Sequence, residues 1–220
     1  MIDYFEYRAS VLNDFVDNHL MDGKRAKNVY EALIAQYKPT YPTPMNKQKG
    51  EMKQPAYFTG IINTIIEANI CDLSVDYDPH KLTSLTRNMK PIRTLARRID
   101  GAFPSSVNPV AIWEIKEYYY ATTFGSRVAD GVYETLLDGM ELEELHNNEN
   151  IKVQHFLMID GHYTWWGDGK SYLCRIIDML HMNYVDQVLF GYEVVETLPG
   201  IVKGWAELLN KNNTIEKETV

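Results

Sequence analysis

The chain has 220 residues, of which 45% are hydrophobic and 12% aromatic, and this composition excludes a wholly disordered protein. Its formal net charge of -8 at pH 7 would argue against nucleic-acid binding if the charge were evenly spread, because phosphate binding depends on clustered cations. The charge is uneven, since residues 81–98 carry six lysines and arginines and no acid.

The first third of the chain is predicted to be helical. Apolar residues recur at near-helical spacing through residues 5–20 and again through 26–37, which indicates two N-terminal helices. The proline- and lysine-containing stretch 38–55 is typical of a loop that touches a partner. Residues 56–70, AYFTGIINTIIEANI, then predict a third helix.

Strands enter after a turn-rich stretch at residues 74–81. Residues 93–104 and 107–119 predict two strands that pair as a hairpin. The remaining elements, in chain order, are a helix at 126–145, a strand at 151–159, a helix at 172–182, a short strand at 186–190 and a helix at 198–210.

This order predicts one α/β domain over residues 1–210, with N-terminal helices at 1–40, an α/β core at 54–190 and a frayed tail at 211–220. No apolar run reaches the roughly 18 residues of a membrane span, and no targeting segment is recognised, so a cytoplasmic protein without membrane contact is expected. Cys71 and Cys174 lie far apart and indicate neither a zinc site nor a disulfide framework, so buried thiols are expected.

The stretch NPVAIWEIKEYY, residues 108–119, places two charges near the end of an otherwise apolar strand. Because alternate side chains of a strand share a face, Glu114 and Lys116 point one way and Trp113 the other. Both faces are apolar up to Trp113, which is typical of a central strand covered on both sides. Each buried charge then needs a partner, and a salt bridge between the two is the simplest alternative to a functional site.

A third charge lies across the predicted hairpin. Asp100 ends the preceding strand, fourteen residues before Glu114, and we expect it to converge with Glu114 and Lys116. Two close carboxylates repel unless a cation lies between them, and oxygen ligands with room for water and phosphate suit Mg²⁺. A neighbouring lysine can orient or help deprotonate the attacking water and balance negative charge on a phosphate.

Asp100 followed by EIK at residues 114–116, each at the end of a hairpin strand, resembles the PD-(D/E)XK nuclease superfamily, the fold of many type II restriction endonucleases. Members of that superfamily follow the motif strand with a helix and a third strand, as residues 126–145 and 151–159 are predicted to do. They precede the motif with a helix that often supplies another glutamate, which Glu67 matches.

The resemblance implies a restriction endonuclease-like core, with a central mixed sheet flanked by helices. It implies that Asp100 and Glu114 bind Mg²⁺, with Mn²⁺ as a substitute, that Glu67 is an accessory metal ligand, and that Lys116 acts on the nucleophilic water. One departure is Ile99, which stands where the family name has proline.

The cationic run leads directly to Asp100, so its side chains are expected at the rim of the proposed metal site, where they would contact phosphates. The start of the following helix could hold a further phosphate. The predicted DNA-binding residues are Arg87, Lys90, Arg93, Arg97, Arg98, Ser126 and Arg127. The alternatives are a solvated charged face for the run and plain helix capping for Ser126.

The sequence therefore predicts a Mg²⁺-dependent DNA endonuclease of restriction or phage-defence type, acting as a homodimer on double-stranded DNA. The alternatives are a non-catalytic nucleic-acid-binding domain and a repair or recombination nuclease with the same fold. No GxGxxG, P-loop, GxSxG or HExxH motif supports an unrelated enzyme. The adjacent Trp165 and Trp166 are expected to divide between core and surface.

Overall fold

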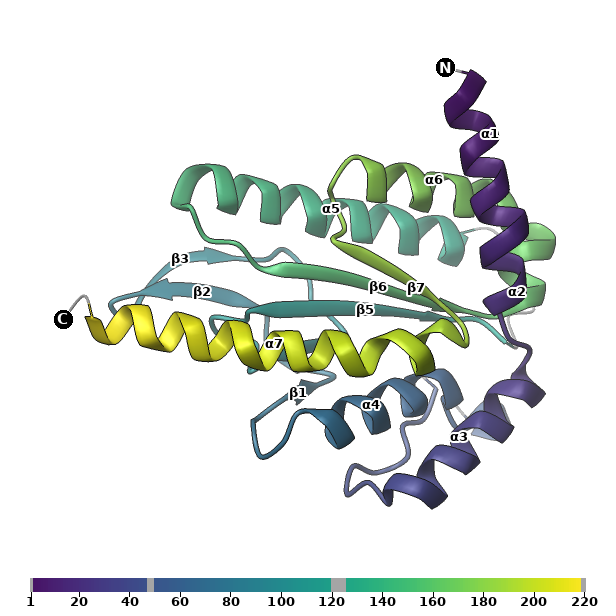
Figure 1. Cartoon of the computed structure of the whole chain (residues 1–220), viewed down its shortest axis with the longest axis horizontal. Coiled ribbons are helices and arrows are strands. Elements are labelled where there is room, and N and C mark those ends of the chain that lie inside the picture. Colours follow the sequence, from purple (N-terminus) through teal and green to yellow (C-terminus); the bar gives the residue numbers. More distant parts are fainter. Residues whose placement is uncertain (1, 47–49, 120–125, 219–220) are drawn as a thin grey trace.

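The computed structural model describes residues 2–46, 50–119 and 126–218, without the side chains of Met52, Ser126, Arg127 and residues 212–218. The described chain is an α/β protein in which a five-stranded mixed sheet is flanked by helices (Figure 1). Its helices are α1 (Ile2–Ser10), η1 (Val11–Val16), α2 (Asp17–His19), α3 (Gly23–Tyr37), η2 (Gly50–Met52), α4 (Tyr57–Asn69), α5 (Ser126–Glu149), η3 (Tyr163–Asp168), α6 (Lys170–His181) and α7 (Glu193–Glu218).

The sheet joins an antiparallel half to a parallel half. Its strand order is β1-β4-β5-β6-β7, with antiparallel pairing as far as β5 and parallel pairing from β5 to β7. A separate hairpin is formed by β2 and β3. The strands are β1 (Asp76–Tyr77), β2 (Ser84–Arg87), β3 (Lys90–Thr94), β4 (Gly101–Phe103), β5 (Ala111–Glu117), β6 (Gln154–Asp160) and β7 (Gln187–Phe190). Helix α5 is the crossover between β5 and β6, as parallel pairing requires.

Strand β5 is buried on both faces, as its sequence predicts. On one face Trp113 packs with residues of α3, α4 and α7, and its ring stacks on that of Trp205 with centroids 5.3 Å apart and planes 9° apart. On the other face Ile112 packs with Leu142 and Leu145 of α5. Figure 1 shows α5 and α6 on one side of the sheet and α4 and α7 on the other. Glu114 and Lys116 share the face of Ile112, beneath α5.

The helices predicted at 5–20, 26–37 and 56–70 are confirmed, and the first is a continuous helical run of α1, η1 and α2. The strand predicted over residues 93–104 is wrong. This stretch contains the end of β3 and the short β4, with residues 95–100 in neither strand. The β2–β3 hairpin was not expected, because Pro91 argues against a strand and its turn uses Asn88 and Met89, both at positive φ, rather than glycine.

Two smaller expectations change, and a third is confirmed. Helix α7 extends over Glu193–Glu218 and so begins before residue 198, where the final helix was predicted to start. Cys71 is exposed and Cys174 half-buried, and both are free thiols. Trp165 is buried and Trp166 half-buried in η3, which confirms a division between core and surface. Among the described residues no helix has the length and hydrophobicity of a membrane span.

Asp160 ties the N-terminal helices to the sheet. It ends β6, is fully buried, and its Oδ1 accepts hydrogen bonds from the backbone N–H groups of Met21 at 2.7 Å and Gly161 at 2.8 Å. The Tyr119 hydroxyl donates to its other oxygen. Burial raises the pKa of Asp160 to about 7, although these donors act in the opposite direction.

Asp160→Asn should flatten the pH dependence of stability. The folded protein keeps a proton on Asp160 up to about pH 7, whereas the unfolded chain loses it near pH 4, so the wild-type free energy of unfolding falls as pH rises between these values. The asparagine variant cannot titrate at this position. The slope of its free energy of unfolding against pH should therefore be shallower by the equivalent of about one bound proton. Urea unfolding from pH 4 to 7.5 measures it, and an unchanged slope would contradict the assignment.

Candidate functional site

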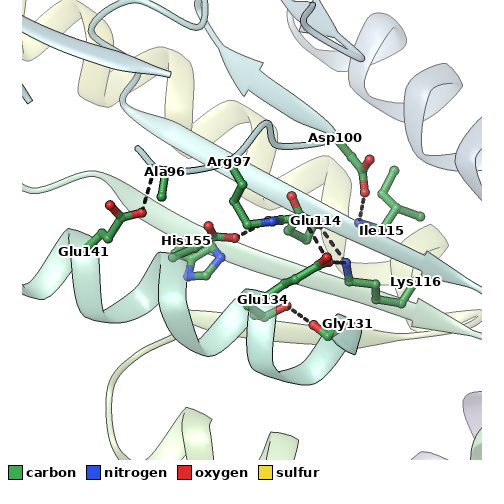
Figure 2. Close-up of polar contacts among 12 residues, drawn as sticks. Ala96, Arg97, Asp100, Glu114, Ile115, Lys116, Gly131, Glu134, Glu141 and His155 are labelled. Atoms are coloured by element: carbon green, nitrogen blue, oxygen red, sulfur yellow. Dashed lines mark hydrogen bonds and ion pairs between the residues drawn. The ribbon is translucent and has the colours of Figure 1, made fainter. Parts of the chain in front are cut away.

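The structure places Asp100 beside β5, in which Glu114 is the middle residue and Lys116 the last but one. Gly101 pairs with Trp113 in the β4–β5 ladder, so Asp100, one residue before β4, lies next to Glu114 in the same register. Its Oδ2 accepts a hydrogen bond of 2.9 Å from the backbone N–H of Ile115 (Figure 2). The register therefore places Asp100 beside the part of β5 that carries Glu114 and Lys116.

Glu114 is buried, with 1% of its surface exposed, and its two oxygens have different surroundings. Oε2 accepts from Lys116 Nζ at 2.9 Å and from Arg97 Nη2 at 3.0 Å. Oε1 is also buried and has no hydrogen-bond partner among the described residues. Burial acts to raise the pKa of Glu114, but the two cations reverse this and lower it, so the carboxyl is ionised.

Lys116 is almost as buried as Glu114 and is nevertheless cationic. Burial favours its neutral form, but the negative charges of Glu114 and Asp100 raise its pKa above the ordinary value. An ammonium group in this state has no free lone pair with which to accept a proton. In this state it donates hydrogen bonds and places positive charge beside Glu114.

Helix α5 supplies two acids that the sequence did not single out. Glu134 Oε2 lies 3.2 Å from Arg97 Nη2 and 3.3 Å from Lys116 Nζ, and nearly half of its side chain is exposed. Asp138, one turn further along, is fully buried and its Oδ2 accepts from Arg97 Nη1 at 2.5 Å. The signal that could have found them is their i,i+4 spacing, which places both on one helix face.

His155 lies behind these charges on β6. It is buried, and its Nδ1 lies 2.9 Å from the backbone oxygen of Tyr184. Burial lowers its pKa, although the nearby Glu114 acts in the opposite direction. The ring lies in the interior beneath α5.

Glu67 does not join this group. Helix α4 packs on the face of the sheet that carries Trp113, opposite to Glu114 and Lys116. Glu67 accepts hydrogen bonds from the backbone N–H and hydroxyl of Thr40 and from the backbone N–H of Tyr41. Its hydrogen bonds anchor the loop after α3, and the structure does not bring Glu67 together with Asp100 and Glu114 as the sequence predicted.

Glu67→Gln should leave any metal-dependent cleavage by this protein within about twofold of the wild-type rate, because the side chain lies across the sheet from the proposed ligands. Initial rates on plasmid DNA at fixed Mg²⁺ measure this. If Glu67→Gln lowered the cleavage rate as much as Asp100→Asn does, Glu67 would be assigned to the metal site after all.

Three of the six cations in residues 81–98 are neutralised within the protein. Arg87 pairs with Glu149, Arg93 with Glu144, and Arg97 with Glu114, Glu134 and Asp138, and all of these acids except Glu114 belong to α5. Three of the predicted DNA-binding arginines therefore hold residues 87–97 against the acidic side chains of α5. Lys90 and Arg98 are exposed and make no ion pair among the described residues. Ser126 and Arg127 begin α5, but their side chains lie outside the described residues.

Asp100 and Glu114 fit a hard divalent cation in the chemistry of their donors. Both are carboxylates, and the buried, unpartnered Oε1 of Glu114 offers a ligand position. Within the described ranges no three His, Cys, Asp or Glu side chains form a complete metal-binding group. A cation such as Mg²⁺ bound here would take its other ligands from water or phosphate, which is its usual preference.

The fold and the site together define an α/β protein with a buried cluster of acids and cations where an antiparallel strand pair meets a crossover helix. The chain belongs to a family described as a domain of unknown function (DUF7687), whose model matches residues 21–205. Neither the curated proteins nor the solved structures contain a match to this chain.

Proposed function

We propose that this protein is a Mg²⁺-dependent DNA endonuclease with a restriction endonuclease-like core, in which Asp100, Glu114 and Lys116 form the active site. The observation that carries the proposal is the β4–β5 register, which sets Asp100 beside a buried glutamate with one unpartnered oxygen. The order of elements supports it further. The motif strand is preceded by a helix and followed by a crossover helix and a parallel strand.

In the proposed reaction, Mg²⁺ held by Asp100 and Glu114 supplies positive charge that stabilises the developing charge on the phosphate. Asp100 is fixed by the Ile115 N–H, and Glu114 by Lys116 and Arg97, so that neither carboxylate has to reorganise. Lys116, as a cation, donates hydrogen bonds to a phosphate oxygen or to the attacking water and orients it. Cleavage adds the oxygen of water to phosphorus and breaks the P–O bond to the leaving sugar oxygen, while the attacking water loses a proton to solvent and the leaving oxygen takes one from solvent.

The test is incubation of purified protein with methylated and unmethylated plasmid DNA in Mg²⁺, in Mn²⁺ and in excess EDTA. Metal-dependent cutting that EDTA abolishes is the expected result, and discrete fragments would indicate sequence-specific restriction. Binding of DNA without cutting of any substrate would instead support the non-catalytic nucleic-acid-binding alternative. Light scattering with and without DNA tests the proposed homodimer, because cutting both strands of a duplex calls for two active sites.

DNA affinity should depend on the exposed cations of residues 81–98 rather than on the paired ones. Lys90→Ala and Arg98→Ala should each weaken binding and lower the salt slope by about one, because each removes a charge available to a phosphate. Arg87→Ala is the matched control, since its guanidinium already pairs with Glu149, and its slope should equal that of the wild type. Fluorescence anisotropy at several salt concentrations measures this, and equal effects of all three substitutions would refute the distinction.

A further inference from the structure

Arg97 is the most highly connected charge of the candidate site. It lies in the segment between β3 and β4, and its guanidinium bridges Glu114 on the sheet and Asp138 on α5, through Nη2 at 3.0 Å and Nη1 at 2.5 Å. Figure 2 shows Arg97 reaching Glu114. A planar guanidinium presents its donors in a fixed fork, so two acids bound at its two nitrogens define its plane. The contacts of Arg97 therefore fix the direction from which it reaches Glu114.

Among the described residues, Arg97 is the only polar side chain to which the Asp138 carboxylate binds. Its side chain has no exposed surface, its Oδ2 binds Arg97, and its Oδ1 has no hydrogen-bond partner. A buried carboxylate is unfavourable unless a charge compensates it, so retention of an acid inside α5 calls for a specific role. Arg97 cannot swing toward solvent without leaving this acid uncompensated.

The orientation of Arg97 also affects Glu114 Oε1, the proposed metal-ligand position. Both cations that bind Glu114 donate to Oε2, so its carboxylate is oriented with Oε1 facing away from them, and no donor in the described part of the chain reaches Oε1. Lys116 sits on a flexible stem and is a point charge, whereas the fork of Arg97 is directional.

We propose that Arg97 and Asp138 are a positioning pair, in which Asp138 fixes Arg97 and Arg97 orients Glu114 so that Oε1 is presented to a divalent cation. This rests on the proposed nuclease function and adds two residues to its site. Neither residue touches the metal, and both act through Glu114.

The experiment measures Mn²⁺ binding by calorimetry on the DNA-free protein, alongside plasmid cleavage. Arg97→Met should weaken Mn²⁺ binding by about 10- to 100-fold, as loss of a residue that orients a metal ligand does elsewhere. Asp138→Asn should act in the same direction, and Arg97→Lys should restore part of the affinity. The double variant should bind no more weakly than Arg97→Met alone, because Asp138 acts only through Arg97.

Arg93→Met is the matched control, since Arg93 lies in the same segment and also pairs with an α5 acid, Glu144, but does not reach Glu114. It should bind Mn²⁺ within about twofold of the wild type. Circular dichroism checks that each variant is folded. If Arg97→Met does not fold, the Mn²⁺ affinities of Asp138→Asn and Arg97→Lys test the positioning role in its place.

The outcomes separate the two proposals. Folded Arg97 and Asp138 variants that bind Mn²⁺ as Arg93→Met does, while the wild type binds and cleaves, would overturn the positioning role alone. A wild type that neither binds Mn²⁺ nor cuts DNA would overturn the nuclease function, and the positioning role with it.

Discussion

Lys116→Met should lower Mg²⁺-dependent cleavage by roughly 100- to 1,000-fold, which is the range expected when a preorganised hydrogen-bond donor to the reacting oxygen atoms is lost. Methionine keeps most of the buried stem and removes only the ammonium that lies 2.9 Å from Glu114 Oε2. Arg97 remains as a cation for the buried glutamate, so the variant should still fold. Initial rates on supercoiled plasmid at saturating Mg²⁺ measure the loss.

Lys152→Met is the control for loss of a lysine, because Lys152 is largely exposed and pairs with Asp186, away from the site. It should cleave at the wild-type rate. A folded Lys116→Met variant that cleaves at a similar rate would contradict a catalytic role for Lys116 and with it the proposed active site.

The largest stability effect should come from Trp205→Ala, with a loss of about 3 to 5 kcal/mol in the free energy of unfolding. Trp205 of α7 is fully buried, stacks on Trp113 and meets the ring of Phe156 edge-on at 5.2 Å between centroids. Its removal would leave a cavity beneath β5, on the face opposite Glu114. Urea unfolding monitored by circular dichroism measures the change.

Tyr163→Ala removes a large aromatic side chain that is 74% exposed, and it should change the free energy of unfolding by no more than about 0.5 kcal/mol. Equal losses in the free energy of unfolding for Trp205→Ala and Tyr163→Ala would show that Trp205 does not stabilise the core. Any fall in cleavage by Trp205→Ala should follow the fraction of folded protein, because Trp205 does not contact the charged cluster.

The strongly patterned parts of the fold could be predicted from the sequence. Apolar residues at helical spacing located α3 and α4, and the two-sided apolar run before Glu114 identified β5 as a central strand. These signals are local, since each depends on residues within one element. Asp100 was predicted to lie next to Glu114 from the end of the preceding strand, whereas it lies one residue before the start of β4, which pairs with the middle of β5.

What could not be predicted depends on contacts between distant segments. A run of cations has the same sequence whether its partner is a phosphate or an acidic helix, and the pairing of Arg93 with Glu144 is visible only once the chain is folded. Glu67 has suitable chemistry for a metal ligand, but the face of the sheet on which α4 packs is set by tertiary contacts. The β2–β3 hairpin was missed because Met89 at positive φ gives no turn signal.

The docking of the β2–β3 hairpin on α5 has a consequence for how the family can diversify. A charge reversal at position 93 alone would set two acids against each other, and a matching reversal at position 144 would restore attraction. Positions 93 and 144, and likewise 87 and 149, are thus expected to change together across relatives. Position 97, which serves three acids at once, has no single compensating partner and should be the slowest of the three arginines to vary.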